Sequence, residues 1–416
     1  MGECVCLRAK FLTGLVAGIL GIGCSGSSTE DAYIEQAGVI HQNALTIDGH
    51  IEIPANYATR EVDPGRDNDF QVDLPKLLVG EIKGIFLVID PGRTASDTED
   101  IASMQAGTTR GLEAIHRLAE EMHPNELEIA YSADDIERIV GSGKLAASIG
   151  IENGLMIGHE IVHIETYFNL GGRYMALPHE IHSEPVDIEM FPGEEFDEAG
   201  LDSLDQQIIG EMNRLGMVVD ISHLSRTAML EAVSLSRAPV IASNSAIRKL
   251  RDHSWNLDDE QLVALRDNGG VVQVVAFGAL LTEDAAKRRR EYNNIRGAFG
   301  MITGQHPEDL GAEPYEDYMG RMEALDERYP DATVSDFVDH VDYAIRVIGI
   351  DHVGISSDFD GGGGISGWNH AGEGLNVTVE LVRRGYSEAD IEKLWGGNLL
   401  RVLREVESVA LRLGES

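Results

Sequence analysis

The chain has 416 residues, and its 33 Lys and Arg against 71 Asp and Glu give a formal net charge of −38 at pH 7. An acidic surface repels phosphate groups, so this charge argues against nucleic acid or an anionic membrane surface as a partner. The length allows two average domains or one large α/β barrel, and either could enclose a sizeable core.

The N-terminal segment has the pattern of an export signal. Arg8 and Lys10 precede an apolar run over residues 11–23, which is too short to span a membrane and ends in small residues before Cys24. The pattern resembles a bacterial lipoprotein signal. We therefore expect residues 1–23 to be removed and Cys24 to carry the lipid that anchors the protein in the cell envelope. A plain secretory signal is the alternative.

The cysteines limit the chemistry of the mature chain. All three, Cys4, Cys6 and Cys24, lie in the N-terminal segment. The rest of the chain then has no disulfide and no thiolate, which leaves His and carboxylate side chains as metal ligands. We expect a polar linker over residues 24–33 and one catalytic domain over residues 34–416.

Eight short apolar runs alternate with helical segments along this domain. Runs of this kind, bounded by Gly, Pro or polar residues, are typical of parallel strands. The fold class that they predict is α/β, a (β/α)8 TIM barrel, in which the active site lies at the carboxyl ends of the strands. The runs cover residues 44–47, 84–89, 145–151, 173–177, 218–221, 240–241, 269–275 and 352–357.

Ligand-type residues stand at the ends of several of these runs. His50 and Glu52 have i, i+2 spacing, which on a strand places both side chains on one face and makes them a candidate metal pair. Imidazole and carboxylate donors without thiols suit zinc or a similar divalent ion in a hydrolytic site. Each of the other residues would by itself more often be structural, but together they predict a site: Glu152, His179, His223, Asn244 and Asp358.

Four consecutive glycines, Gly361 to Gly364, follow Asp358 and Asp360. A glycine run can cradle phosphate, but no P-loop lysine follows this one, and the acidic pair disfavours anions. We interpret the run as a loop that lets the backbone pass close to the site, and Asp360 as a residue that fixes this loop.

Several motifs carry a family resemblance over residues 41–407. They are DGHIEIP, GIENG, GRYMALPH, GLDSLDQQIIGEMNRLGMVVDISHLS, PVIASNSA, DHVGISSDFDG and NLLRV. With these motifs the chain resembles the membrane (renal) dipeptidase family of the amidohydrolase superfamily. The resemblance implies a zinc-dependent hydrolase of dipeptides or related small amides, with one or two zinc ions per chain.

The resemblance also carries roles onto single residues. It assigns metal-ligand roles to His50, Glu52, Glu152 and His223. It makes Asp358 the proton-handling acid and places His179 at the carbonyl oxygen of the substrate. The implied mechanism is attack of a metal-bound hydroxide on the amide carbonyl, after which Asp358 passes a proton to the departing amine.

Three positions depart from the family pattern. Glu52 replaces an Asp, so a carboxylate remains there. Asn244 replaces a His and is a weak or lost ligand of the second zinc. Trp255, just before Asn256, replaces the Arg that holds the terminal carboxylate of the substrate, and an indole cannot make that charge-assisted fork. We expect Trp255 and Asn256 to face the substrate together with His179.

Three hypotheses follow from these departures. The first is a hydrolase with one tight metal and a substrate other than a free dipeptide, such as an N-acyl amino acid. The second is an ordinary dipeptidase in which Arg248, Arg251 or His182 replaces the lost groups. The third is a catalytically weak or inactive barrel that acts as a binding lipoprotein. The first two take a small-molecule partner, and a homodimer is compatible with all three.

Overall fold

The computed structural model describes residues 29–92, 98–178, 200–301, 307 and 310–414. Residues 1–28 lie outside this part of the chain, so the expected signal segment and Cys24 anchor stay predictions. Among the described residues, no helix has the length and apolar character needed to cross a membrane.

A parallel sheet of nine strands forms the centre of the molecule. The order along the sheet is β1-β2-β4-β5-β6-β7-β8-β9, and β3 pairs with β4 beside this path. A parallel bridge between Ile51 and Phe359 brings the last strand back to the first, so that eight strands make a nearly closed barrel. The strands are β1 (Ile47–Glu52), β2 (Gly84–Ile89), β3 (Leu127–Ile129), β4 (Leu145–Ile151), β5 (Gly172–Ala176), β6 (Val218–Asp220), β7 (Ile241–Ser245), β8 (Val271–Val275) and β9 (Val353–Ser356).

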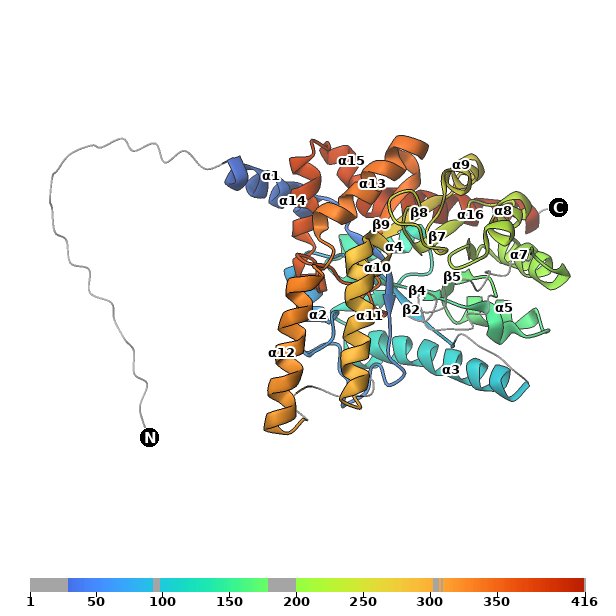
Figure 1. Cartoon of the computed structure of the whole chain (residues 1–416). Helices are drawn as coiled ribbons and strands as arrows, with labels where there is room; N and C mark the ends of the chain where they lie inside the picture. The colour runs from blue at the N-terminus through green and yellow to red at the C-terminus, as the bar shows by residue number, and fades with distance from the viewer. Residues whose placement is uncertain (1–28, 93–97, 179–199, 302–306, 308–309, 415–416) are drawn as a thin grey trace, which may run out of the picture.

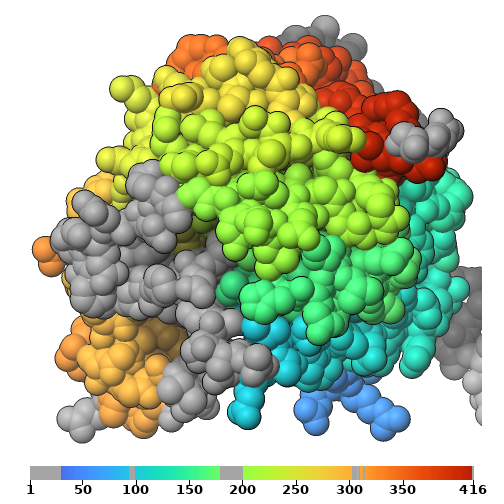
Figure 2. Space-filling model, turned by 90° about the vertical axis from the view of Figure 1, so that its right-hand side faces the viewer, coloured from blue at the N-terminus to red at the C-terminus, as the bar shows by residue number. Residues whose placement is uncertain are grey.

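Helices surround this barrel (Figure 1). Figure 2 shows one side of the cover, where α3, α5, α7, α8 and α9 follow one another in chain order from cyan to yellow. The α-helices are α1 (Thr29–Asn43), α2 (Leu74–Val79), α3 (Thr98–Arg117), α4 (Ala133–Gly141), α5 (Val162–Asn169), α7 (Ser203–Leu215), α8 (Arg226–Leu235), α9 (Asp259–Asn268), α10 (Gly278–Leu281), α11 (Glu283–Ala298), α12 (Ala312–Arg328), α13 (Val334–Ile348), α14 (Leu375–Arg383), α15 (Glu388–Glu392) and α16 (Asn398–Gly414).

Local sequence signals explain where several helices begin and end. A capping box of Asp202 and Asp205 starts α7, which ends at Gly216 with a left-handed φ of 85°. A second box, formed by Asp258 and Gln261, starts α9. The defined ends of α7 and α9 therefore help to fix where the strands that follow them, β6 and β8, begin.

Two apolar clusters form the core. The larger one contains Leu87, Ile149, Val219 and many helix residues. The smaller one contains Phe86 and Tyr174 from the strands and one face of α16. The rings of Phe86 and Tyr174 stack with their centroids 5.3 Å apart, and the Tyr174 hydroxyl reaches the side chain of His50. This second cluster therefore packs beneath the polar residues at the strand ends, and it is called the apolar floor below.

The predicted (β/α)8 barrel is confirmed, with three differences in detail. Strand β1 begins at Ile47, so His50 and Glu52 lie within the strand and not after it. The three-residue β3 has no counterpart among the predicted runs, since it is too short to give a periodic signal. Helix α1 begins at Thr29 and takes in the last residues of the segment expected as a linker.

His340 on α13 links two loops of the barrel from a buried position. Its Nδ1 accepts a hydrogen bond from the Ile247 amide at 3.0 Å, and its Nε2 donates to the Leu281 carbonyl at 3.0 Å. These two bonds hold the neutral tautomer with the proton on Nε2. Burial lowers the pKa of His340 to about 4.

Protonation of His340 should make the folded state less stable in mild acid. Because its folded pKa is lowered, its contribution is complete above the unfolded pKa of about 6.5 and is lost as pH falls from there toward 4. We expect the free energy of unfolding to fall by roughly 1 kcal/mol between pH 7.5 and 5.5 through this group. In His340→Gln, which can keep both hydrogen bonds, this part of the loss should disappear in denaturant titrations. The exposed His159→Gln should behave as the wild type, and an equal loss in His340→Gln would contradict the assignment.

Candidate active site

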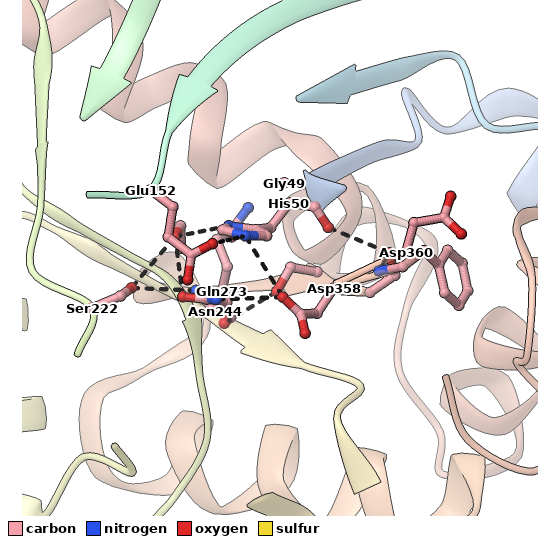
Figure 3. A network of polar contacts seen from close by, with 12 residues as sticks. Gly49, His50, Glu152, Ser222, Asn244, Gln273, Asp358 and Asp360 are labelled. Atoms are coloured by element: carbon pink, nitrogen blue, oxygen red, sulfur yellow. Dashed lines mark hydrogen bonds and ion pairs between the residues drawn. The ribbon is translucent and has the colours of Figure 1, made fainter. Parts of the chain in front are cut away.

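Four side chains from different strand ends converge above the apolar floor. Figure 3 shows His50, Glu152, Asn244 and Asp358 pointing toward one another. The Nε2 atom of His50 lies 3.9 Å from Oε2 of Glu152 and 3.6 Å from Oδ1 of Asp358. His223, which follows β6, places its Nε2 3.3 Å from Oε1 of Glu152. The predicted site residues on five strand ends are therefore brought together.

Asp220 anchors this arrangement from below. It is fully buried at the end of β6. Its Oδ1 accepts from the Ser222 amide and hydroxyl at 3.0 and 2.7 Å and from the Ser243 amide at 3.0 Å. Its Oδ2 accepts from the Ser243 hydroxyl at 2.6 Å. A buried carboxylate is tolerated when it is hydrogen-bonded in this way, and here the bonds tie the ends of β6 and β7 together.

The same network assigns the tautomer of His50. Because the Ser243 hydroxyl donates to Asp220, its oxygen is left to accept from Nδ1 of His50, 3.1 Å away. The Tyr174 hydroxyl also lies 3.1 Å from Nδ1, and 3.3 Å from the Gly49 carbonyl, to which it donates. Burial raises the pKa of Tyr174 well above its usual range, so the hydroxyl keeps its proton. Nδ1 of His50 therefore carries the hydrogen, and the lone pair on Nε2 faces Glu152 and Asp358.

The glycine run brings the backbone close to Glu52. A Cβ atom added to Gly361 would lie 2.4 Å from Oε1 of Glu52, so a larger residue there would displace the Glu52 carboxylate. The Glu52 amide donates to the Phe359 carbonyl at 3.0 Å, which holds the start of the loop against β1. This geometry agrees with the interpretation of the run as a loop passing close to the site.

Asp358 sits in a backbone conformation that L residues rarely adopt. Its φ is 57°, that of Asp360 is 61°, and that of His223 is 67°. Such left-handed positions cost of order 1–3 kcal/mol each and are typical of functional sites. The Asp358 amide donates to the His50 carbonyl at 3.0 Å, and its Oδ1 accepts from Nδ2 of Asn244 at 3.4 Å. The strained turn thus directs the Asp358 carboxylate into the site.

Asp360 faces away from these residues (Figure 3). Its Oδ1 accepts from the Gln71 amide at 2.9 Å, and its own amide donates to Oε1 of Gln71 at 2.8 Å. Burial raises the pKa of Asp360 to about 6. These contacts fix the loop, as the sequence predicted.

Two overlapping groups of side chains are placed to hold a metal ion. Within each group, one donor atom from each side chain lies within 4.8 Å of the others. Carboxylate and imidazole donors are the types that divalent ions bind in hydrolytic sites. The groups are His50, Glu52 and Asp358, and Glu52, Asp90 and Glu152.

Asp90 was not among the predicted site residues. It follows β2 and stands directly before Pro91 and Gly92. Its position at the carboxyl end of a strand was the available signal. Asp48 was also passed over. Its carboxylate accepts from the Ser357 amide at 3.0 Å and the His50 amide at 3.3 Å, and burial raises its pKa to about 6.

Trp255 forms part of the wall of the site. The indole lies edge-on to the imidazole of His223, with ring centroids 4.6 Å apart. Asn256 is fully buried behind it, and its Nδ2 donates to the Arg251 and Leu280 carbonyls at 2.9 and 2.8 Å. The structure gives Asn256 a part in fixing the loop that carries Trp255, and a direct contact with substrate stays a prediction.

The candidate replacement cations lie elsewhere. Nε of Arg248 pairs with Asp252 at 2.9 Å, and Arg248 lines a separate surface pocket. Arg251 donates to the Asp252 carbonyl at 2.6 Å and lies 3.4 Å from Glu283. His179 and His182 fall outside the described residues, so their expected roles stay predictions.

A pocket opens at this convergence. Its lining contains both polar and apolar residues. The polar residues are Glu52, Glu152, His223, Asn244 and Asp358, and the others are Trp255, Val275, Phe277, Leu280 and Gly361.

Comparison with known proteins gives the site a context. A family model described as membrane dipeptidase, peptidase family M19, matches residues 34–416. The dipeptidase tcpJ of Claviceps purpurea is 30% identical over 402 residues, which cover 94% of this chain and 82% of that protein. The dipeptidase aclJ of Aspergillus oryzae is 30% identical over 351 residues, covering 83% of this chain and 72% of that protein.

Solved structures share the fold. The probable dipeptidase PvdM from Pseudomonas aeruginosa matches with a TM-score of 0.76 and 29% identity, over 91% of this chain and all of that one. A metallopeptidase from Rhodobacter sphaeroides, liganded with a phosphinate mimic of the dipeptide L-Ala-D-Ala, matches with a TM-score of 0.61 and 21% identity. This second match covers 87% of this chain and 99% of that one. The chain therefore belongs to the membrane dipeptidase family of metal-dependent peptidases.

Proposed function

We propose that this protein is a zinc-dependent hydrolase of small amides of the dipeptide class. The observation that carries the proposal is the convergence of His50, Glu152, His223 and Asp358 at the strand ends of a barrel from this family. His50, Glu52 and Glu152 would hold one ion, with Asp90 as a further ligand within reach of Glu52 and Glu152. Glu152 and His223 would contribute to a second ion. A bound zinc supplies Lewis-acid polarisation of the amide carbonyl and makes water a better nucleophile.

The donor set fits such an ion. The network under His50 leaves its Nε2 lone pair facing the carboxylates, which is the tautomer that a metal-ligating imidazole needs. Glu152 is buried between two imidazoles, and burying a carboxylate beside other carboxylates is costly unless a cation compensates the charge. Both features support a resident cation.

Asp358 is the proposed proton carrier. Its carboxylate lines the pocket and is held by the Asn244 amide and the strained loop. From that position an Asp358 oxygen takes a proton from the attacking water and gives it to the leaving amine nitrogen. The same carboxylate makes both transfers, so it ends the reaction in the protonation state in which it began.

The presence of Asn244 argues for a site that binds one ion tightly and a second ion weakly. Its amide donates to Asp358, and an amide oxygen is a poorer zinc ligand than an imidazole nitrogen. The second position would then have Glu152 and His223 as its good ligands among the described residues. This favours an active enzyme that works with a single tight metal over an inactive binding barrel.

Metal binding should stabilise the fold through Glu152 and Asp90. Ligand at a hundred times its Kd adds about 2.7 kcal/mol to the folded state, so excess zinc should raise the thermal midpoint and a chelator should lower it. We expect the zinc-dependent rise to be lost in Glu152→Gln and reduced in Asp90→Asn, as measured by scanning calorimetry. The exposed Glu160→Gln should keep the full rise. An undiminished rise in Asp90→Asn would remove Asp90 from the metal site.

Restoring an imidazole should restore the second ion. We expect Asn244→His to raise retained zinc from about one to about two ions per chain after dialysis, as measured by plasma mass spectrometry. Asn244→Ala should stay at one ion. Two tightly held ions in the wild type would show that other residues compensate for Asn244.

Removing the proposed proton carrier should stop turnover and leave the metal in place. We expect Asp358→Asn to lower kcat about 10²- to 10⁴-fold on a dipeptide panel, with zinc content unchanged. Asp360→Asn, two residues away and facing outward, is the matched control and should lose far less. Loss of zinc in parallel with kcat would make Asp358 a ligand and contradict the proton-carrier role.

A further inference from the structure

The pocket at the strand ends is lined by the reacting groups and by four apolar residues. These four, Trp255, Val275, Phe277 and Leu280, are called the apolar wall below. A substrate group that lies against this wall leaves water for an apolar surface, which is favourable for uncharged groups and costly for charged ones. The wall therefore favours a substrate that is uncharged at the end that lies against it.

Trp255 adds one polar atom to this wall. The residue is 6% exposed, and its Nε1 has no hydrogen-bond partner among the residues that the structure describes. A buried donor without a partner costs about 1–3 kcal/mol, and a substrate carbonyl oxygen would remove that cost. The indole that carries this donor contacts the imidazole of His223, with ring centroids 4.6 Å apart.

None of the described residues that line the pocket is a Lys or an Arg. Arg248 and Arg251 are engaged with Asp252 and its neighbours. The Cζ atom of Arg289 lies over the ring of Phe277, 4.5 Å from its centroid, and Nη1 of Arg289 donates to the Gly362 carbonyl at 2.9 Å. A substrate carboxylate would meet an apolar surface in a strongly acidic protein.

We infer that Trp255 sets the substrate class as peptides whose carboxyl end is blocked as an amide or ester. The inference rests on the proposed hydrolase function. The blocked end lies against the apolar wall, and its carbonyl oxygen accepts from Nε1 of Trp255. Hydrolysis then breaks the peptide C–N bond, joins the water oxygen to the carbonyl carbon, and moves one water proton to the amine nitrogen. The blocking group itself is unchanged.

The test compares two substrates that differ only at this end. Zinc-loaded protein of residues 24–416 is assayed with L-alanyl-L-alanine and with L-alanyl-L-alanine amide. We expect the wild type to have at least about a tenfold higher kcat/KM for the amide, because the site cannot compensate a desolvated carboxylate. Calorimetry of each variant shows whether it is folded.

Two substitutions of Trp255 separate its ring from its donor. Trp255→Phe keeps an aromatic wall and removes the N–H, so kcat/KM for the amide should fall about five- to tenfold, mainly through KM. Trp255→Arg adds a cation, and it should raise kcat/KM for the free dipeptide and reverse the preference. A purely structural role of Trp255 would lower kcat/KM for both substrates together and leave the ratio of the two values unchanged.

The outcomes separate this inference from the proposed function. A wild type that prefers the free dipeptide, or a substrate ratio that stays constant in both variants, would overturn the inference and leave the hydrolase intact. Arg289→Gln would then show whether that side chain is the cation. No turnover of either substrate by zinc-loaded wild type would overturn the proposed function and this inference with it.

Discussion

The buried charge of Asp220 is the constraint on which the site depends. A carboxylate taken out of water costs several kcal/mol unless its oxygens are well hydrogen-bonded, and Asp220 meets this condition with bonds from Ser222 and Ser243. These bonds use the Ser243 hydroxyl hydrogen, so the oxygen of Ser243 is left to accept from His50. A residue that touches no reacting atom thereby decides which nitrogen of His50 faces the pocket.

The barrel holds this hydrogen-bond network in place, and it also holds the strained backbone next to the network. His223 and Asp358 both have positive φ, which side chains with a Cβ rarely adopt. The Asp358 turn is held by its bond to the His50 carbonyl and by the bridge that joins the ends of β1 and β9. Since these partners belong to strands packed on an apolar floor, the cost of the turn is offset by the fold and the carboxylate stays directed inward.

Much of this could be read from the sequence, for physical reasons. Strands of a parallel barrel are buried on both faces, so they appear as continuous apolar runs, and their carboxyl ends meet at one edge. That rule brought His50, Glu52, Glu152, His223, Asn244 and Asp358 together before any coordinates. It did not find Tyr174, which has the pattern of a core aromatic, because its contact with His50 depends on packing across the barrel.

The same limit applies to Asp90 and Asn256. Asp90 was not predicted, and only the geometry brings its carboxylate within reach of Glu52 and Glu152. The expected contact of Asn256 with substrate stays a prediction, and only the geometry shows that its amide hydrogens are donated to two backbone carbonyls. The measurement that tests the central claim most directly is a crystal structure of the zinc-soaked protein with anomalous data at the zinc edge. The account predicts a peak about 2.0–2.2 Å from Nε2 of His50 and from oxygens of Glu52 and Glu152. A zinc bound through Nδ1 of His50, or no peak at these residues, would contradict it.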